Sequence, residues 1–269
     1  MQLILPVTPD AFGSLNTGHS ETVARRYRVE ASVCPNPFCQ CDGIRLRLFP
    51  KGARDSTVAV CLYLDLRKRR ISNPKGLKWV PAPSPLAKTL TAQFKDSDWE
   101  TLRDRYIAAK LNYTDRTDWD KVEIPKEAMK KARSPVGYNE IIPYNVGIDF
   151  RLGSDHWVVR DHYCADPECS CADVVLIFFR MDKMTGEREE RPRLFCLYDY
   201  RTGKVTREDP KGEGSPSADE LLRAMRRATP KLSVRLGQRH ARLRKLFRRA
   251  IGQRIIPAKT VLAGRGSTS

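Results

Sequence analysis

The sequence lacks any long hydrophobic run and has few acidic residues for its number of basic ones. No stretch approaches the ~18 apolar residues of a membrane-spanning helix, and 32 Asp and Glu stand against 49 Lys and Arg, for a net charge of +17. The apolar start MQLILPVTP has no cationic segment before it and breaks at Pro6, unlike a secretory signal. We therefore expect a cytoplasmic protein in a reducing compartment, where cysteines are metal ligands or free thiols more often than disulfides.

Recognisable catalytic motifs are also missing. The chain has no H-E-x-x-H, G-x-S-x-G, Walker A or deaminase motif and only four histidines. The nearest approach to a catalytic cluster is Asp155-His156 followed by Asp161-His162, which is open to reading as a nuclease-like or second metal site. Two polar turns flanking a strand over 157–160 explain it better. The sequence thus favours a protein that is not an enzyme, with an enzyme of unrecognised type as the third interpretation.

An internal repeat is what the sequence does contain. CPNPFCQCDGIRLRLF from Cys34 returns as CADPECSCADVVLIFF from Cys164, an offset of 130. VAVCLYL around Cys61 then matches RLFCLYD around Cys196 at an offset of 135. The repeat places all eight cysteines: Cys34, Cys39, Cys41 and Cys61 in the first copy, and Cys164, Cys169, Cys171 and Cys196 in the second.

Strands precede a helix in each copy. Apolar residues alternate with polar ones over 44–48 and 58–64, the period of half-buried strands that pair as antiparallel neighbours. A third strand is expected near Val205, after the turn signal TG. SDWETLR from Ser97 and SADELLR from Ser217 both resemble capping boxes and predict helices over 97–111 and 217–228. Thr229-Pro230 then predicts the start of a longer helix that ends near 251.

These patterns predict an α+β fold with an internal duplication. Two homologous zinc-stabilised units, each a small antiparallel sheet plus a helix, precede a basic C-terminal helical region. The proline-rich residues 72–95 are expected to form a connector. The predicted segments are 1–96 (first zinc unit with connector), 97–147 (helix and linker), 148–212 (second zinc unit) and 213–269 (basic helical region with a frayed tail).

Three clustered cysteines and one from a later strand are a suitable ligand set for zinc. Zn²⁺ takes four soft ligands in a tetrahedron, with thiolates about 4 Å apart, and Pro37 and Gly43 suit the curl that Cys-x-Cys needs. We therefore predict two Zn²⁺ per chain, each closed by four thiolates and structural. The alternatives are buried or redox cysteines and an iron–sulfur cluster, whose usual spacing differs. His162, with His156, is a weaker candidate ligand because Ser32 stands at its place in the first copy.

The basic charge is concentrated near the C-terminus. Residues 217–269 hold 14 Lys and Arg against two acids, a local balance of +12. The helix over 230–251 has separate apolar and basic stripes, and a second basic cluster follows the first strand pair. The candidate nucleic-acid-binding residues are Arg67, Lys68, Arg69 and Arg70 in that cluster and Arg235, Arg239, Arg242 and Arg249 on the helix.

A polyanionic partner relieves this unbalanced repulsion and gains from counterion release. We therefore expect a zinc-binding, non-enzymatic protein that binds nucleic acid through its phosphates. The alternative is a zinc-stabilised adapter that docks an acidic or apolar protein surface. For that role the second sheet is suited, since residues 174–179 are apolar on both strand faces.

The string DHYCADPECSCADVVLIFF, with GQRHARLRKLFRRA from Gly237, resembles uncharacterised bacterial proteins that carry C-x4-C-x-C metal-binding modules of the SEC-C-associated type. This chain has no cysteine-rich tail at its C-terminus, where those proteins often carry one. The resemblance implies a metal-binding protein of bacterial origin and assigns no activity to any residue.

Overall fold

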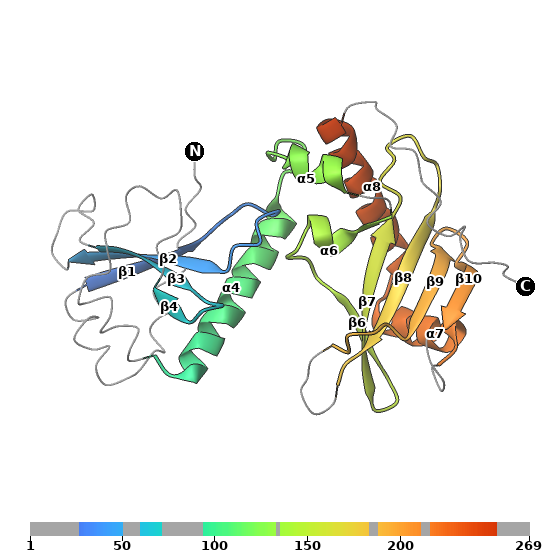
Figure 1. Cartoon of the computed structure of the whole chain (residues 1–269), viewed down its shortest axis with the longest axis horizontal. Coiled ribbons are helices and arrows are strands. Elements are labelled where there is room, and N and C mark those ends of the chain that lie inside the picture. The colour runs from blue at the N-terminus through green and yellow to red at the C-terminus, as the bar shows by residue number, and fades with distance from the viewer. Residues whose placement is uncertain are drawn as a thin grey trace, which may run out of the picture. The chain divides into compact units, whose positions relative to one another are not determined.

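The computed structural model describes residues 27–50, 60–71, 94–132, 135–182, 188–210 and 216–251. The chain divides into two compact units, Met1–Arg116 and Thr117–Ser269, and each combines an antiparallel sheet with helices (Figure 1). The predicted α+β class with small antiparallel sheets is confirmed. Within the described ranges, no helix is long and apolar enough to cross a membrane.

The first unit contains a four-stranded antiparallel sheet in the order β1-β2-β3-β4. Its strands are β1 (Tyr27–Val33), β2 (Gly43–Pro50), β3 (Val60–Asp65) and β4 (Arg70–Ile71). The register pairs Ile44 with Leu64 and Leu46 with Leu62, and all four side chains are buried. Because successive residues of a strand point to opposite faces, these pairs make one continuous apolar face, as the alternation predicted.

Helix α4 (Asp96–Arg116) belongs to the first unit and packs beside β1. Trp99, Leu102 and Tyr106 recur at helical spacing and are buried, so they form its apolar stripe. The helix begins at Asp96, so Ser97 lies within its first turn and is not the N-cap residue that the sequence suggested.

The second unit contains a six-stranded antiparallel sheet. Its order is β10-β9-β8-β7-β5, with β6 also paired to β7. The strands are β5 (Val136–Gly137), β6 (Ile148–Leu152), β7 (Asp155–Tyr163), β8 (Asp173–Arg180), β9 (Leu194–Asp199) and β10 (Lys204–Pro210). The short helix α5 (Lys126–Lys131) precedes β5, and the short helix α6 (Tyr138–Ile141) lies between β5 and β6. β10 confirms the third strand expected near Val205.

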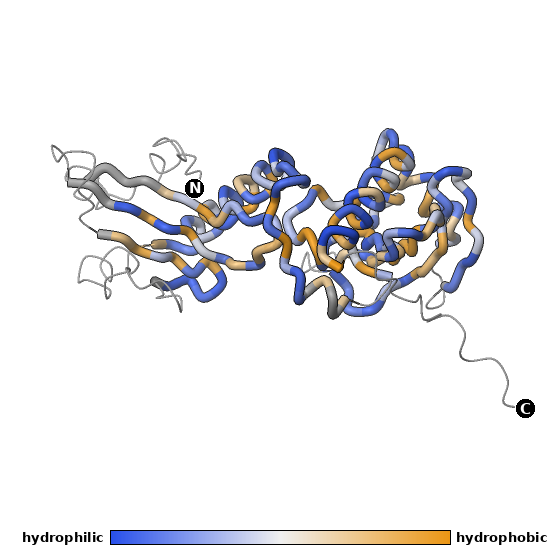
Figure 2. The backbone as a smooth tube through the Cα atoms, turned by 90° about the horizontal axis from the view of Figure 1, so that it is seen from above, coloured by the Kyte–Doolittle hydropathy of each residue, from blue (hydrophilic) through white to orange (hydrophobic). Residues whose placement is uncertain are grey.

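Helices α7 (Ala218–Ala228) and α8 (Leu232–Ile251) cover one face of this sheet (Figure 1). Figure 2 shows apolar and polar residues alternating along both helices, and the apolar side of α8 buries Leu236, Leu243 and Phe247. The Ser217 hydroxyl and the Glu220 carboxylate form the predicted capping box of α7. Thr229, in contrast, is the C-cap of α7 and not the N-cap of the following helix.

Some expectations fall outside the described residues. They are most of the connector over 72–95, the N-terminal residues 1–26 and the tail after residue 251.

Candidate metal centres

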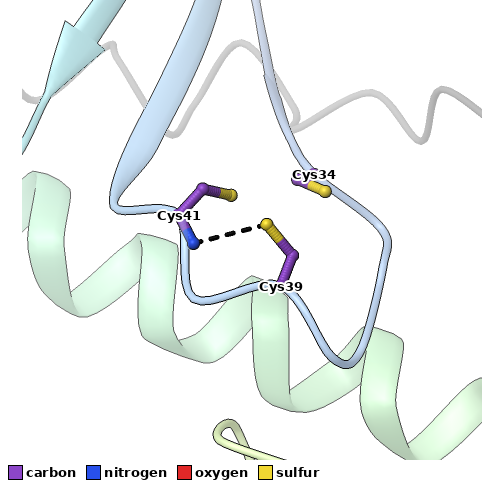
Figure 3. A group of neighbouring side chains, drawn as sticks. All are labelled: Cys34, Cys39 and Cys41. Atoms are coloured by element: carbon purple, nitrogen blue, oxygen red, sulfur yellow. Dashed lines mark hydrogen bonds between the residues drawn. The ribbon is translucent and has the colours of Figure 1, made fainter. Parts of the chain in front are cut away.

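Two hairpin loops each hold three cysteines with their sulfur atoms close together. Cys34, Cys39 and Cys41 lie between β1 and β2, and within the triad the Sγ atoms are all within 4.8 Å of one another (Figure 3). A second triad, formed by Cys164, Cys169 and Cys171, lies between β7 and β8 with the same limit on its Sγ separations. In each unit, the three predicted ligands that are close together in the sequence are therefore also close together in space.

Backbone hydrogen bonds curl the first loop around its sulfur atoms. The Asn36 side chain accepts from the Phe38 amide at 2.9 Å, and the Cys39 amide donates to the Asn36 carbonyl at 3.2 Å. The Cys41 amide then donates to Cys39 Sγ at 3.3 Å. The thiolate is the form of a cysteine that binds a metal ion, and this curl brings the three sulfur atoms together.

The second loop repeats this pattern bond for bond. Asp166 accepts from the Glu168 amide at 2.9 Å through its carboxylate and from the Cys169 amide at 3.3 Å through its carbonyl. The Cys171 amide donates to Cys169 Sγ at 3.4 Å. The strand pairing beside the loops also corresponds: Val33 pairs with Ile44 in the first unit, and Tyr163 pairs with Val174, 130 residues later, in the second.

Three thiols this close interfere with one another's ionisation. The Cys41 thiol, the Asn36 backbone and the Lys110 charge together lower the pKa of Cys34 to about 5, against the opposing effect of burial. The same thiol–thiol hydrogen bond raises the pKa of Cys41, and a bond to Cys164 raises that of Cys171. In each triad, a hydrogen bond between the first and last cysteines therefore couples the ionisation of the two thiols. A divalent cation replaces the thiol protons and lets all three sulfurs ionise.

A helix crosses each loop and fixes its carbonyl groups. In the first unit, the Lys110 ammonium donates to the carbonyls of Cys34 at 3.0 Å and Asn36 at 2.7 Å. Tyr106, one turn earlier on α4, donates its hydroxyl to the Cys41 carbonyl and lies 3.9 Å from the Cys41 sulfur. Lys110 is only 1% exposed, so its charge acts on the triad with little screening.

In the second unit α8 supplies the corresponding contacts. His240 Nε2 lies 3.1 Å from the Cys164 carbonyl, and Arg244 donates to the Cys171 carbonyl at 2.7 Å and approaches its sulfur at 3.5 Å. Burial, with the Arg244 charge next in size, lowers the pKa of His240 to about 4. The neutral ring donates from Nε2 and accepts the Tyr200 hydroxyl at Nδ1, 3.1 Å away.

The two helices meet their loops in opposite directions. Along α4, Tyr106, which bonds the last cysteine of its loop, comes before Lys110, which bonds the first. Along α8 the order is reversed, because His240, which bonds the first cysteine, comes before Arg244, which bonds the last. The loop and its strands therefore repeat, whereas the helix that supports them does not follow the repeat.

Cys61 and Cys196, the predicted fourth ligands, are not part of either triad. Cys61 lies on β3, where it pairs with Arg47 of β2. Gly43, at the loop end of β2, pairs with Asp65, which is four residues and about 13 Å along β3 from Cys61. Cys196 is buried, with a pKa raised to about 12 mainly by burial. Among the described residues, no other His, Cys, Asp or Glu joins either group. The structure therefore groups three of the four predicted thiols in each unit and places the fourth elsewhere.

The offset of 135 that matched these two cysteines is also wrong by one residue. Arg47 pairs with Cys61, and Ile177, which lies 130 residues after Arg47, pairs with Phe195. Phe195 is therefore the counterpart of Cys61. Because side chains alternate between faces, a shift of one residue moves a side chain to the opposite face.

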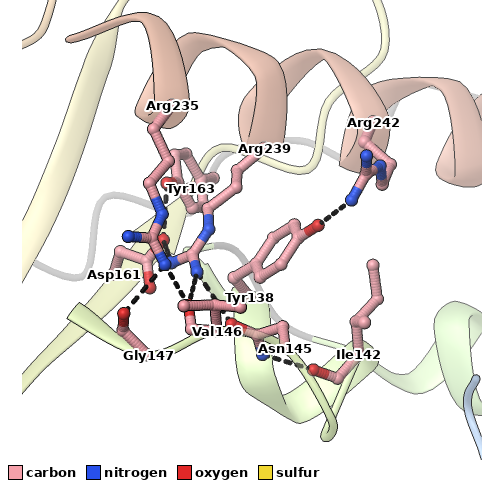
Figure 4. A network of polar contacts seen from close by, with 10 residues as sticks. All are labelled: Tyr138, Ile142, Asn145, Val146, Gly147, Asp161, Tyr163, Arg235, Arg239 and Arg242. Atoms are coloured by element: carbon pink, nitrogen blue, oxygen red, sulfur yellow. Dashed lines mark hydrogen bonds and ion pairs between the residues drawn. The ribbon is translucent and has the colours of Figure 1, made fainter. Parts of the chain in front are cut away.

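The predicted basic face of α8 is not a free surface. Arg239 is 6% exposed and donates to the Asp161 carboxylate at 2.7 Å and the Asn145 side chain at 2.8 Å (Figure 4). Its guanidinium also stacks over the Tyr138 ring at 4.6 Å, and Tyr163 donates to the same carboxylate at 2.6 Å. A buried acid and protein oxygens, in place of a polyanion, balance this charge.

The other three arginines of that predicted face also bond within the second unit. Arg235 donates to the Gly147 carbonyl at 2.8 Å, Arg242 to the Tyr138 hydroxyl at 2.6 Å and Arg249 to the Val122 carbonyl at 2.9 Å. All four arginines therefore bond within the second unit, although Arg249 is exposed, and their binding to phosphates stays a prediction. The helical periodicity identified the arginine stripe of α8, but it gave no information about residues 119–147, whose carbonyl groups and side chains bond to these arginines.

The basic cluster Arg67–Arg70 is exposed, as expected of a binding surface. Arg67, Lys68 and Arg69 lie in the turn between β3 and β4, and Arg70 begins β4. Arg69 has a φ of 49° and pairs with Asp96 at 2.5 Å. A second exposed basic turn, Arg201–Lys204, follows β9, with Gly203 at a φ of 74°. We call these two segments the basic turns.

The doubled Asp-His motif does not form one cluster. Asp161 is buried against Arg239, His162 lies 3.5 Å from Glu140, and His156 lies 3.1 Å from Asp149. The aspartates and the histidines point to opposite faces of β7. All four residues lie within β7, so the polar turns expected on either side of a strand over 157–160 are wrong, and the residues do not form one catalytic or metal cluster either.

Sequence reasoning missed the residues that support the triads: Lys110, His240 and Arg244. A signal was present, because Tyr106 and Lys110, like His240 and Arg244, are four residues apart on a helix and therefore share a face. Lys110 and His240 occupy buried positions where an apolar residue is the rule, and such positions require a partner.

No protein family, curated protein or solved structure matches this chain. The resemblance to SEC-C-associated proteins stays a prediction.

Proposed function

We propose that this protein binds two zinc ions, one at each cysteine triad, and that the metal-bound protein binds nucleic acid without catalysing a reaction. The observation that carries the first part is the repetition of one loop, with the same three sulfurs and the same hydrogen bonds, in two units. Thiolate ligands select thiophilic ions such as Zn²⁺ over Mg²⁺ or Ca²⁺.

The ion would connect the two ends of each loop. Cys34 follows β1 directly, and Cys41 lies two residues before β2. An ion held by both sulfurs ties the two strands at the point where hairpin pairing ends, and the carbonyl contacts of α4 and α8 tie the helix to the same loop. Zinc supplies about 10 kcal/mol to the folding of small modules.

Elemental analysis of protein purified without added metal tests this part. We expect two zinc ions per chain, and one ion in each of the variants Cys39→Ser and Cys169→Ser. Soluble, folded protein that carries less than about half an ion per chain would contradict the proposal.

We propose each basic turn, one in each unit, as a separate contact surface for nucleic acid. Their side chains are exposed, and each turn joins the end of a metal loop through a backbone bond, from the Leu66 amide to the Asp42 carbonyl at 2.8 Å and from the Tyr200 amide to the Ala172 carbonyl at 3.2 Å. Arg226 of α7 adds a charge beside the second turn, where it donates to the Gly203 carbonyl at 2.6 Å. Lysine and arginine on turns suit contacts to phosphates and carry little sequence preference.

A salt series tests the nucleic-acid proposal. We would measure binding to duplex DNA, single-stranded DNA and RNA for the wild type and for a variant with Arg67, Lys68 and Arg70 changed to Gln. For every phosphate that the variant no longer neutralises, the log–log salt slope should become shallower by about 0.7–0.9. The matched control changes Arg235, Arg242 and Arg249, which bond internally, to Gln. No binding of any of the three nucleic acids at low salt would contradict the proposal.

The second candidate is the adapter, which one observation favours. On the sheet face away from α7 and α8, apolar side chains are paired across β7, β8 and β9 and remain half-buried: Val158, Val175, Ile177, Phe195 and Leu197. Apolar surface of this kind marks protein contacts. A partner that survives nuclease treatment and no longer binds an Ile177→Lys variant would replace the nucleic-acid proposal with this one.

A further inference from the structure

The chain has too few cysteines and histidines to give each triad a fourth ligand of either type. The chain has eight cysteines and four histidines. Six cysteines form the triads, and Cys61 and Cys196 lie elsewhere. Three histidines are placed outside the triads, and only His19 falls beyond the described residues. One histidine can complete one site at most, so the other ion needs an oxygen donor or an external ligand.

The second triad is accessible to such a ligand. Cys164, Cys169 and Cys171 are all half-buried, not enclosed. A zinc ion with three protein ligands keeps its fourth position for water or substrate, in contrast to a closed structural site.

The charge at this triad does not repel an anionic ligand. One Zn²⁺ and three thiolates carry a net charge of −1. The Arg244 guanidinium, fixed by the Cys171 carbonyl at 2.7 Å, lies 3.5 Å from the Cys171 sulfur and balances that charge. A further anion therefore meets a locally neutral site, and an ion that has already taken three sulfurs prefers a soft donor.

We infer that the ion at Cys164, Cys169 and Cys171 binds a small thiol at its fourth position, an inference that rests on the proposed zinc binding. The thiol gives its proton to solvent, its sulfur forms the new bond to zinc, and a water molecule leaves. No oxidation state changes. The protein thereby holds a thiol as a metal-bound thiolate near a fixed arginine.

Cobalt-substituted full-length protein tests the inference, with 2-mercaptoethanol as the probe and ethylene glycol as its sulfur-free control. The sulfur-to-cobalt charge-transfer absorbance grows with the number of Co–S bonds, so a change from three to four sulfurs at one site should raise that site's absorbance about 1.3-fold. The rise should saturate while bound cobalt stays constant. It should persist in Cys39→Ser and in His19→Ala, and Cys169→Ser should lose the part of the rise that comes from the second triad.

Two variants on α8 test the role assigned to the charge. Arg244→Gln should bind cobalt but need several-fold more thiol for half-saturation. Lys245→Gln, which removes an exposed charge one residue later on the same helix, should behave as wild type. Bound cobalt whose absorbance does not respond to the thiol would overturn the inference and leave metal binding intact. Failure to bind cobalt or zinc at all would instead refute the proposed function, and the inference with it.

Discussion

At the scale of single residues, each triad is built from three cysteines that are close together in the sequence. The triads span only eight residues each, so their spacing alone brought the sulfurs together. The fourth ligand depended on which residue of β3 or β9 faces the loop, and that is set by strand register. Cys61 and Cys196 occupy the right strands at the wrong places. Aligning Cys61 with Cys196 by residue type hid the fact that Phe195, one residue earlier, is the counterpart of Cys61 in the strand pairing. Side chains alternate between the two faces of a strand, so Cys61 and Cys196 point to opposite faces.

Serine at the two remote cysteines should leave the metal content unchanged. Cys61→Ser and Cys196→Ser place a hydroxyl at buried positions, which we expect to cost about 1–3 kcal/mol of unfolding free energy. Both variants should still carry two zinc ions by elemental analysis, unlike Cys39→Ser and Cys169→Ser. A loss of one ion in either remote variant would return that cysteine to the ligand set.

Gly43 is where the first loop tolerates no side chain. A Cβ at this position would lie 1.9 Å from the Tyr63 ring, whereas one at Gly147 meets nothing within 4 Å. Gly43→Ala should therefore lower the unfolding free energy of the first unit by about 1–3 kcal/mol, measured by chemical denaturation, and Gly147→Ala should change it little. Adding Tyr63→Leu to Gly43→Ala should recover part of the loss, since Leu197 stands at the corresponding place in β9. Equal stability of the two alanine variants would contradict this account.

At the scale of elements, periodicity located α7 and α8 but could not say what their polar faces contact. An arginine stripe is the same in sequence whether it meets solvent, a phosphate or a buried aspartate. In this protein, the segment between α5 and β6 turns back over α8 and supplies carbonyls and Tyr138 to the stripe. Such pairings join residues about 80–100 positions apart, beyond the reach of any local pattern.

Removing one member of the buried ion pair should destabilise the second unit strongly. In Arg239→Met the Asp161 carboxylate stays buried without its cation, and we expect a loss of about 3–5 kcal/mol. Hydrogen exchange of β7 amides measures the effect. Arg223→Met, at an exposed site on α7, is the control and should cost no more than about 0.5 kcal/mol.

The double variant Arg239→Met with Asp161→Asn separates a missing attraction from an uncompensated charge. It should be more stable than Arg239→Met alone, because the orphaned charge is gone. A double variant at least as unstable as the single one would show that the packing of the guanidinium, and not its charge, matters at this site.

At the scale of the whole molecule, the two units carry one loop in surroundings of different size. Within the described residues, the first unit has four strands and α4, and the second has six strands and several helices. A smaller unit buries a smaller fraction of its surface and depends more on a metal ion or other cross-link. The repeat in the sequence predicted equal dependence on zinc. The structure favours unequal dependence.

Metal removal should therefore affect the two units differently. After chelation, we expect backbone amides throughout β1, β2 and α4 to exchange rapidly, because the first unit unfolds without its ion. In the second unit, only the ends of β7 and β8 beside the loop should lose protection, while the strand centres and α8 stay protected by their own core. Hydrogen exchange followed by mass spectrometry reads both units in one experiment. Cys39→Ser should reproduce the first effect alone and Cys169→Ser the second alone, so a global loss of protection from either substitution would show that the two units unfold as one.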